Sequence, residues 1–315
     1  MSTYSDKIKI FAGSSHPELA QEICDYLGTD LLDAEVVRFA DGEVSVRTNE
    51  TVRGADVFVI QPTCPPINEN LMELLVIIDS LRRASARRIT AVVPYYGYAR
   101  QDRKAQPREP ITAKLVANLL TKAGARRALS IDLHAPQIQG FFDIPVDNLY
   151  SAPILVEYFK QRDLENLTAV APDVGAVKRV RSFAEALDIP MAIIDKRRPK
   201  PNVAEVVNII GESKVEESSV ILFDDIIDTG GTISEAARVL DRNGARKVYA
   251  CATHGLFSGS AEERLNEAPL EEIIVTNSIP QNNRQLEDLK VISVASLLGE
   301  AIDRIFKDLS VSVLF

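Results

Sequence analysis

The chain has 315 residues, which at roughly 150 residues per domain predicts two compact domains. Its 36 Lys and Arg residues against 45 Asp and Glu residues give a formal net charge of -9 at pH 7. That sign argues against sequence-independent binding to nucleic acid or to an anionic membrane. Any anions that the protein binds must therefore be held by local clusters.

Cysteine usage and hydropathy indicate the compartment. Cys24, Cys64 and Cys251 are an odd number, lie far apart and form no CxxC pair, so the sequence predicts neither a disulfide framework nor a thiolate zinc site. The first nine residues are polar, and no stretch approaches the roughly 18 consecutive apolar residues of a membrane span. We expect a cytoplasmic protein.

In the first half, short apolar runs alternate with segments of helical period, which is typical of parallel sheets flanked by helices. A capping box from Ser15 to Glu18 predicts one helix start, and a stripe of Leu115, Leu119 and Leu120 ending at Gly124 predicts another helix. The leucines and isoleucines of 71–81 recur on one face of a further helix. The predicted strands are 8–11, 56–60, 88–93 and 128–133.

The second half shows the same alternation of apolar runs and helical segments. The fold is therefore predicted to be α/β, with two tandem lobes that each hold a mainly parallel sheet flanked by helices. The boundary is expected within 145–153, which gives domains of 1–148 and 149–315. The predicted strands are 167–171, 191–194, 219–223, 247–253 and 272–276, and the clearest helices are 175–187 and 231–243.

Residues 220–232 are the most specific segment: four apolar residues precede Asp224 and Asp225, and an Asp-Thr-Gly-Gly-Thr run follows. Paired glycines let the backbone approach an anion, and N–H groups at a helix start receive it. Carboxylates cannot bind that phosphate, so the two acids are interpreted as acceptors for ribose 2- and 3-hydroxyls. The segment therefore predicts a sugar-phosphate site at the carboxyl edge of a sheet.

An ordinary strand-to-helix turn, with Asp228 as the helix cap and the glycines as breakers, is the alternative interpretation of this segment. Two adjacent acids with no evident partner at the end of a buried strand argue against it.

Residues 224–232 resemble the phosphoribosyl diphosphate loop of the type I phosphoribosyltransferase fold, which nucleobase phosphoribosyltransferases and ribose-phosphate diphosphokinases share. The two-lobed length and four further segments resemble the diphosphokinases, namely 39–43, 95–104, 132–149 and 196–199. The resemblance implies two phosphoribosyltransferase-like lobes. It also implies the reaction of ATP with ribose 5-phosphate to give AMP and 5-phosphoribosyl 1-diphosphate, with Mg2+.

The resemblance also implies roles for individual residues of the second lobe. Lys196 and Arg198, in a run of four cations within five residues, would stabilise the transition state, as a point charge and as a bidentate fork. A solvated basic turn is the alternative for this run. The implied ribose 5-phosphate contacts are Arg198, Asp224, Asp225, Asp228, Thr229, Gly230, Gly231 and Thr232.

Magnesium and ATP contacts follow from the same resemblance. His134 and Asp173 each end a predicted strand and are the implied Mg2+ ligands, although His is an unusual ligand for so hard a cation. A hydrogen-bonded structural role is the alternative for His134. The implied ATP contacts are Phe39, Asp41, Gly42, Glu43, Arg100 and Gln101. Phe39 offers a stacking face, and the acids suit the adenine and ribose end.

Residues 94–110 form a basic, irregular stretch that suits a mobile lid over triphosphate, with an exposed loop that binds nothing as the alternative. The resemblance further implies homo-oligomers, commonly hexamers whose ATP site borrows residues across an interface, with inhibition by ADP and activation by phosphate. Two other functions remain open at this point: a non-catalytic regulatory homologue and a nucleobase phosphoribosyltransferase.

Overall fold

The computed structural model describes residues 7–162, 164–197 and 206–314, of which 196, 197, 206 and 207 are described by their backbone alone. Contacts divide the chain into two compact units. The first holds the chain up to Tyr150, residues 278–280 and the segment from Ser293 onward, and the second holds Ser151–Asn277 and Gln281–Ile292. The sequence-based division had placed 293–315 in the second domain, whereas the contacts place this segment in the first unit.

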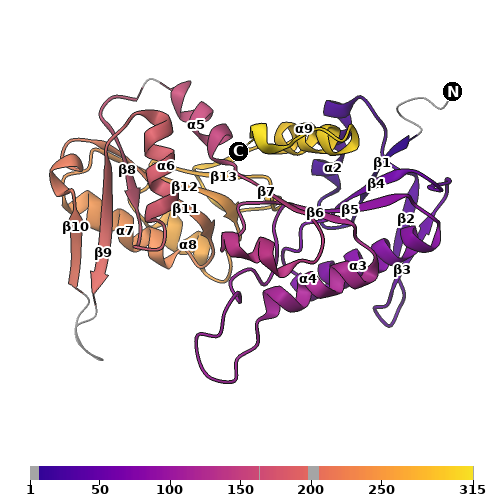
Figure 1. The fold of residues 1–315 in the computed structure, drawn as a ribbon. Coiled ribbons are helices and arrows are strands. Elements are labelled where there is room, and N and C mark those ends of the chain that lie inside the picture. Colours follow the sequence, from indigo (N-terminus) through magenta and orange to yellow (C-terminus); the bar gives the residue numbers. More distant parts are fainter. Residues whose placement is uncertain (1–6, 163, 198–205, 315) are drawn as a thin grey trace. The chain divides into compact units, whose positions relative to one another are not determined.

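The first unit is built on a five-stranded parallel sheet of order β1-β4-β5-β6-β7. Helices α3 and α4 cover one face, and α2 and α9 cover the other (Figure 1). The elements are β1 Ile8–Ala12, α2 Pro17–Leu27, β4 Asp56–Ile60, α3 Ile67–Arg83, β5 Arg88–Val93, α4 Thr112–Ala123, β6 Arg127–Ile131, η1 Pro136–Phe141, β7 Val146–Leu149, α9 Ala295–Phe306 and η3 Ser312–Leu314.

Two details of these helices differ from the prediction. His16, not Ser15, is the cap of α2, because the His16 side chain accepts a hydrogen bond from the Leu19 N–H. On α4 only Leu120 of the predicted stripe is buried, while Leu115 and Leu119 are exposed. The buried face of α4 is formed instead by Leu120 together with the smaller residues 113, 116 and 117. Gly124 caps this helix as predicted.

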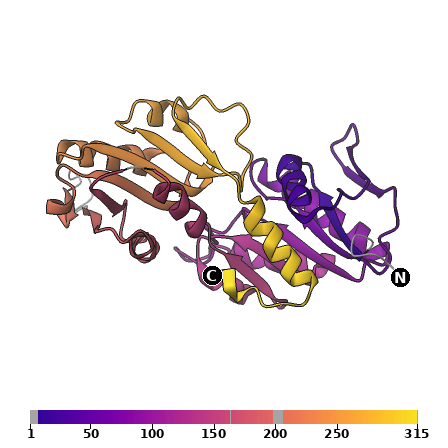
Figure 2. The same ribbon diagram turned by 90° about the horizontal axis from the view of Figure 1, so that it is seen from above.

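The C-terminal helix α9 packs against α2, and Figure 2 shows it lying across the strands of the first unit. A Cβ atom on Gly299 would lie 2.3 Å from Cδ1 of Tyr26, so only glycine allows this approach. The Tyr26 hydroxyl also donates a hydrogen bond to Glu300. This close packing is what places the end of the chain in the first unit.

An antiparallel hairpin of β2 (Ala34–Arg38) and β3 (Val44–Thr48) forms a two-stranded sheet of its own in the first unit. Ala34, Val36 and Val46 pack one face of the hairpin against the core. Its turn carries Phe39, Asp41, Gly42 and Glu43, which were predicted to contact ATP, and the hairpin stands outside the five-stranded sheet.

The second unit has a seven-stranded sheet of order β10-β9-β8-β11-β12-β13-β14, in which only β10 and β9 pair antiparallel. The α/β prediction is confirmed. The elements are α5 Ala152–Lys160, β8 Leu167–Ala171, α6 Val177–Leu187, β9 Met191–Arg197, β10 Val206–Ile210, η2 Glu212–Lys214, β11 Ser219–Ile227, α7 Gly231–Arg242, β12 Lys247–Gly255, α8 Ala261–Asn266, β13 Glu272–Thr276 and β14 Leu289–Ile292.

Strand β11 is central to the second unit and is buried on both faces. Ile221 and Phe223 face α5 and α6, and the ring of Phe223 stacks on Phe183 with centroids 4.3 Å apart. Val220 and Leu222 point the other way, toward α7 and α8. Packing on both faces explains why the strand reads as a continuous apolar run.

The cysteines and the helices are described across both units. Cys24, Cys64 and Cys251 are free thiols, and all three are buried. Within the described ranges, each helix falls short of the length and apolar character that spanning a bilayer requires.

Candidate functional site

Strand β11 continues to Ile227, four residues beyond its predicted end at Phe223. The reason is that β12 is equally long and keeps pairing with it as far as Gly255. On the other side, β8 pairs with β11 only up to Leu222. Asp224 and Asp225 are therefore strand residues that extend past the end of β8, at the carboxyl edge of the sheet.

The turn after β11 presents backbone N–H groups. Gly230 is the cap of α7 with a φ of 73°, and the cap position itself supplies no side-chain hydrogen bond to the helix. The cap is therefore Gly230 and not Asp228, against the ordinary-turn interpretation. The first N–H groups of a helix have no partner inside it, so the start of α7 suits an anion.

The two glycines of this turn have different tasks. A Cβ atom on Gly230 would lie 3.1 Å from Cγ of Leu265 and 3.3 Å from the carbonyl oxygen of Ala261, in a left-handed conformation that side chains disfavour. A Cβ atom on Gly231 would meet nothing closer than the Thr229 hydroxyl at 3.9 Å. Gly230 is required by the fold, whereas Gly231 keeps the approach to the backbone open.

Arg179, on the first turn of α6, is the partner of the two acids and was missed by the sequence analysis. Its Nη1 atom lies 2.8 Å from Oδ1 of Asp224 and 3.1 Å from Oδ1 of Asp225. The Asp225 N–H also donates to Oδ1 of Asp224 at 2.8 Å. The expectation that the acids lack a partner is therefore wrong.

The electrostatics of this pair are unusual. Burial, with a smaller contribution from the neighbouring Asp225 carboxylate, raises the pKa of Asp224 to about 7, although Arg179 opposes the shift. Near neutral pH both protonation states of Asp224 are therefore populated. Perturbed carboxyl groups at a strand edge are typical of ligand sites.

Asp173 follows β8, the strand next to β11, and so lies at the same edge of the sheet as Asp224 and Asp225. It is exposed, and its Oδ1 accepts the Ala176 N–H at 3.1 Å, just before α6 begins. Asp173 thus orders the turn that leads to Arg179. Its second carboxylate oxygen is the one available to a hard cation.

The cationic run does not follow a strand but begins inside one. The backbone of Lys196 and Arg197 belongs to β9, three residues beyond its predicted end, because β10 pairs with it in antiparallel register. Arg198, the second predicted transition-state residue, lies outside the described residues. Strand β9 is separated from β11 by β8 alone.

The hairpin of the first unit exposes its predicted ATP residues. Phe39 is 55% exposed, and Asp41, Gly42 and Glu43 are also exposed. The turn is closed by its own bonds, since the Phe39 N–H donates to the Glu43 carbonyl at 2.8 Å and the Glu43 N–H donates to Oδ1 of Asp41. Asp41 therefore shapes the turn.

The predicted lid has two parts. Residues 95–97 and 99 are buried, and the Gly97 N–H donates to Oγ1 of Thr63 at 2.7 Å, so this part is anchored. From Arg100 to Pro110 the chain is almost wholly exposed. Gln101 is tied to the start of α4 through Thr112. The mobility of the lid stays a prediction, now confined to 100–110.

His134 follows β6 and is exposed, and it belongs to the first unit whereas Asp173 belongs to the second. Among the residues that the structure describes, no three His, Cys, Asp or Glu side chains gather as a metal cage. Mg2+ usually takes one or two protein ligands and completes its shell with water and substrate phosphates, so the two ligands stay a prediction.

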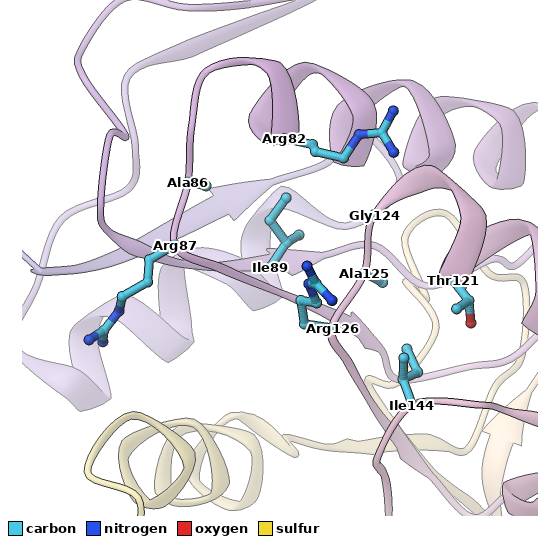
Figure 3. Close-up of a pocket in the computed structure, with 9 residues that line it drawn as sticks. All are labelled: Arg82, Ala86, Arg87, Ile89, Thr121, Gly124, Ala125, Arg126 and Ile144. Carbon is cyan, nitrogen blue, oxygen red and sulfur yellow. The ribbon is translucent and has the colours of Figure 1, made fainter.

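A pocket of about 290 Å3 lies at the opposite, amino edge of the first sheet (Figure 3). It is basic, but Arg82 and Arg87 point away from each other in Figure 3 and are committed to Asp79 and Asp56. This pocket is therefore separate from the strand ends where the candidate site residues lie.

Comparison with known proteins covers the whole chain. The model of the N-terminal domain of ribose phosphate pyrophosphokinase matches residues 8–124, and the phosphoribosyl synthetase-associated domain matches residues 196–315. Curated ribose-phosphate pyrophosphokinases are similar over their full length. The protein of Caldanaerobacter subterraneus subsp. tengcongensis is 57% identical, with 100% of both chains covered, and that of Thermotoga maritima is 57% identical, with 99% covered.

A solved structure is also similar. The phosphoribosylpyrophosphate synthetase from Mycobacterium smegmatis is 43% identical in sequence and superposes with a TM-score of 0.90, over 96% of this chain and 99% of that one.

Proposed function

The chain belongs to the ribose-phosphate pyrophosphokinase family, and we propose that its second unit holds ribose 5-phosphate while its first unit supplies the contacts to ATP. The enzyme transfers the diphosphoryl group of ATP to the 1-hydroxyl of ribose 5-phosphate. The products are AMP and 5-phosphoribosyl 1-diphosphate, which serves nucleotide biosynthesis. The observation that carries the division of substrates is the start of α7, a helix capped by glycine that follows two acids paired with Arg179.

The second unit orients the sugar. The 5-phosphate binds the N–H groups and hydroxyls of 228–232, and the glycine at 231 leaves room for it. Asp224 and Asp225 accept hydrogen bonds from the 2- and 3-hydroxyls, which presents the 1-hydroxyl for attack. Because the sugar is held at both ends, the reacting oxygen is kept in one place.

Cationic side chains stabilise the negative charge of the diphosphoryl group during its transfer. The 1-hydroxyl attacks the β-phosphorus of ATP, and negative charge accumulates on the diphosphoryl group and on the departing AMP. Lys196 and Arg198, carried by β9 and the segment after it, stabilise that charge. Arg100 and Gln101 contact the triphosphate, and the exposed segment 100–110 closes over it and excludes water.

Mg2+ would be held by His134 and Asp173 together with substrate phosphates. When bound, it neutralises phosphate oxygens that would otherwise repel the attacking hydroxyl. The exposed carboxylate of Asp173 is the kind of hard ligand that such an ion prefers.

The assembly and its regulation are part of the same proposal. The chain forms homo-oligomers, of which a hexamer is the expected form, in the cytoplasm, with ADP as inhibitor and phosphate as activator. Exposed apolar side chains at Ile111, the cap of α4, and at Leu115 and Leu119 on the helix support a face that a second copy covers. Light scattering and rates measured with added ADP or phosphate test these points.

One assay tests the reaction against both alternatives. The full-length protein is incubated with ATP, Mg2+ and ribose 5-phosphate, and AMP and 5-phosphoribosyl 1-diphosphate are measured by ion-exchange chromatography. We expect equal amounts of both products, and none when ribose 5-phosphate is omitted. No AMP would indicate a regulatory homologue. Consumption of 5-phosphoribosyl 1-diphosphate on addition of a nucleobase would indicate a phosphoribosyltransferase.

A further inference from the structure

Glu73 is a fully buried carboxylate on α3 that serves several segments of the first unit. Its Oε1 accepts the Ser14 N–H at 2.7 Å and Nε2 of Gln61 at 3.0 Å. Its Oε2 accepts the Ser14 hydroxyl at 2.6 Å and Nη2 of Arg38 at 3.1 Å. Four donors from three places in the chain thus converge on one side chain.

Arg38 is the counter-ion in this cluster. A buried carboxylate is costly unless it is paired and hydrogen-bonded, and the other donors to Glu73 are uncharged. Arg38 also approaches Glu69, one turn earlier on α3, at 3.8 Å. Its side chain is 38% exposed, so the pair joins a buried acid to a guanidinium at the surface.

The position of Arg38 in the hairpin gives the contact its significance. Arg38 is the last residue of β2 and directly precedes Phe39, the first residue of the turn that carries the proposed ATP contacts. The opposite end of the hairpin is held separately, because Glu50 pairs with Lys9 and accepts the Asp33 N–H. Within the described hairpin, the contacts of Arg38 with Glu73 and Glu69 join its turn end to α3.

We propose that Arg38 and Glu73 are positioning residues for ATP, which fix the turn 39–43 against α3 so that it meets the adenine and ribose end of the nucleotide. This inference rests on the proposed function of the hairpin. Ser14 and Gln61 complete the arrangement by holding the Glu73 carboxylate in one orientation. Neither Arg38 nor Glu73 needs to touch substrate for the turn to depend on them.

Arg38→Gln tests the inference, because it removes the charge while keeping a side chain of similar length. We expect the KM for ATP to rise about tenfold, the loss of one hydrogen bond to a charged group, with the KM for ribose 5-phosphate unchanged. Arg38→Lys should recover part of the loss. Arg47→Gln is the matched control, because Arg47 is an exposed arginine on β3 of the same hairpin. It should leave both constants unchanged.

Hydrogen exchange at the amides of the turn provides a second readout that needs no substrate. Arg38→Gln should speed exchange of the Phe39 and Gly42 amides, which bond within the turn, and Arg47→Gln should not. An unchanged KM for ATP overturns the inference. If exchange is also unchanged, the failure lies in the positioning; if exchange is faster, it lies in the proposed ATP role of the hairpin.

Discussion

Residues 224–232 of the second unit, proposed to bind ribose 5-phosphate, and the hairpin 34–48 of the first unit, proposed to contact ATP, are held in place by different means. The loop 224–232 is the direct continuation of a central strand into a helix, so its conformation is set by the backbone and by one glycine at positive φ. The hairpin lies outside the main sheet, and a pair of charged side chains holds its turn end. Some changes in the loop should therefore affect folding and others the binding of ribose 5-phosphate, whereas a change of Arg38 should raise the KM for ATP and leave the KM for ribose 5-phosphate unchanged.

The largest effect is expected at Lys196, the proposed transition-state residue of the second unit. Lys196→Ala should lower kcat by about 10²–10³, the usual consequence of removing one group that stabilises transition-state charge. The KM values for both substrates should change much less. Initial rates over both concentration ranges provide the measurement. A large rise in KM at constant kcat would show that Lys196 binds substrate in the ground state.

The two glycines of the loop sharpen the distinction between folding and binding. Gly230→Ala should lower the melting temperature by several degrees, because an alanine there suffers about 1–2 kcal/mol of left-handed strain and contacts Leu265. Gly231→Ala should leave the melting temperature unchanged and raise the KM for ribose 5-phosphate about tenfold, since its methyl group occupies the space in front of the N–H groups. Calorimetry and kinetics on both variants decide this. Equal melting temperatures for Gly230→Ala and Gly231→Ala would contradict the assignment of Gly230 to folding and Gly231 to binding.

Arg179→Gln should weaken the binding of ribose 5-phosphate several-fold, with little effect on the KM for ATP. Arg179 lowers the pKa of Asp224, which burial holds at about 7, so its removal raises that pKa further. The carboxylate is the better acceptor for sugar hydroxyls. The fall in ribose 5-phosphate affinity on acidification should therefore begin at higher pH in the variant.

The pH profile of the KM for ribose 5-phosphate measures this shift. Arg181→Gln is the control, because Arg181 is an exposed arginine on the same helix. Identical profiles for the parent and Arg179→Gln would show that the ion pair with Arg179 does not set the pKa of Asp224.

The smallest effect is expected at the basic pocket of Figure 3. Arg126→Gln should change both KM values by less than about twofold, as for most surface substitutions, because the pocket lies at the edge of the sheet opposite the strand ends. Steady-state kinetics check this. A larger change in either KM would show that the pocket at the amino edge of the first sheet affects substrate binding.

The sequence predicted the α/β fold and the loop 220–232 because their signals are contiguous. Apolar runs, two acids and paired glycines follow one another within thirteen residues. The extension of β11 to Ile227 escaped prediction because it depends on pairing with β12, and no local pattern reports the length of a partner strand.

Contacts between distant segments were the part that could not be predicted. Arg179 precedes Asp224 by 45 residues, and on α6 it looks like any surface arginine. The C-terminal helix was assigned to the second domain by position alone, whereas its place in the first unit depends on Gly299 facing Tyr26. The Arg38–Glu73 pair likewise joins residues 35 positions apart.

The central claim is that each unit holds one substrate, and the most direct test is to measure both KM values on Arg38→Gln and Arg179→Gln side by side. The account predicts that the first variant raises only the KM for ATP and the second raises only the KM for ribose 5-phosphate. Variants that each raise both constants to the same extent would contradict the division.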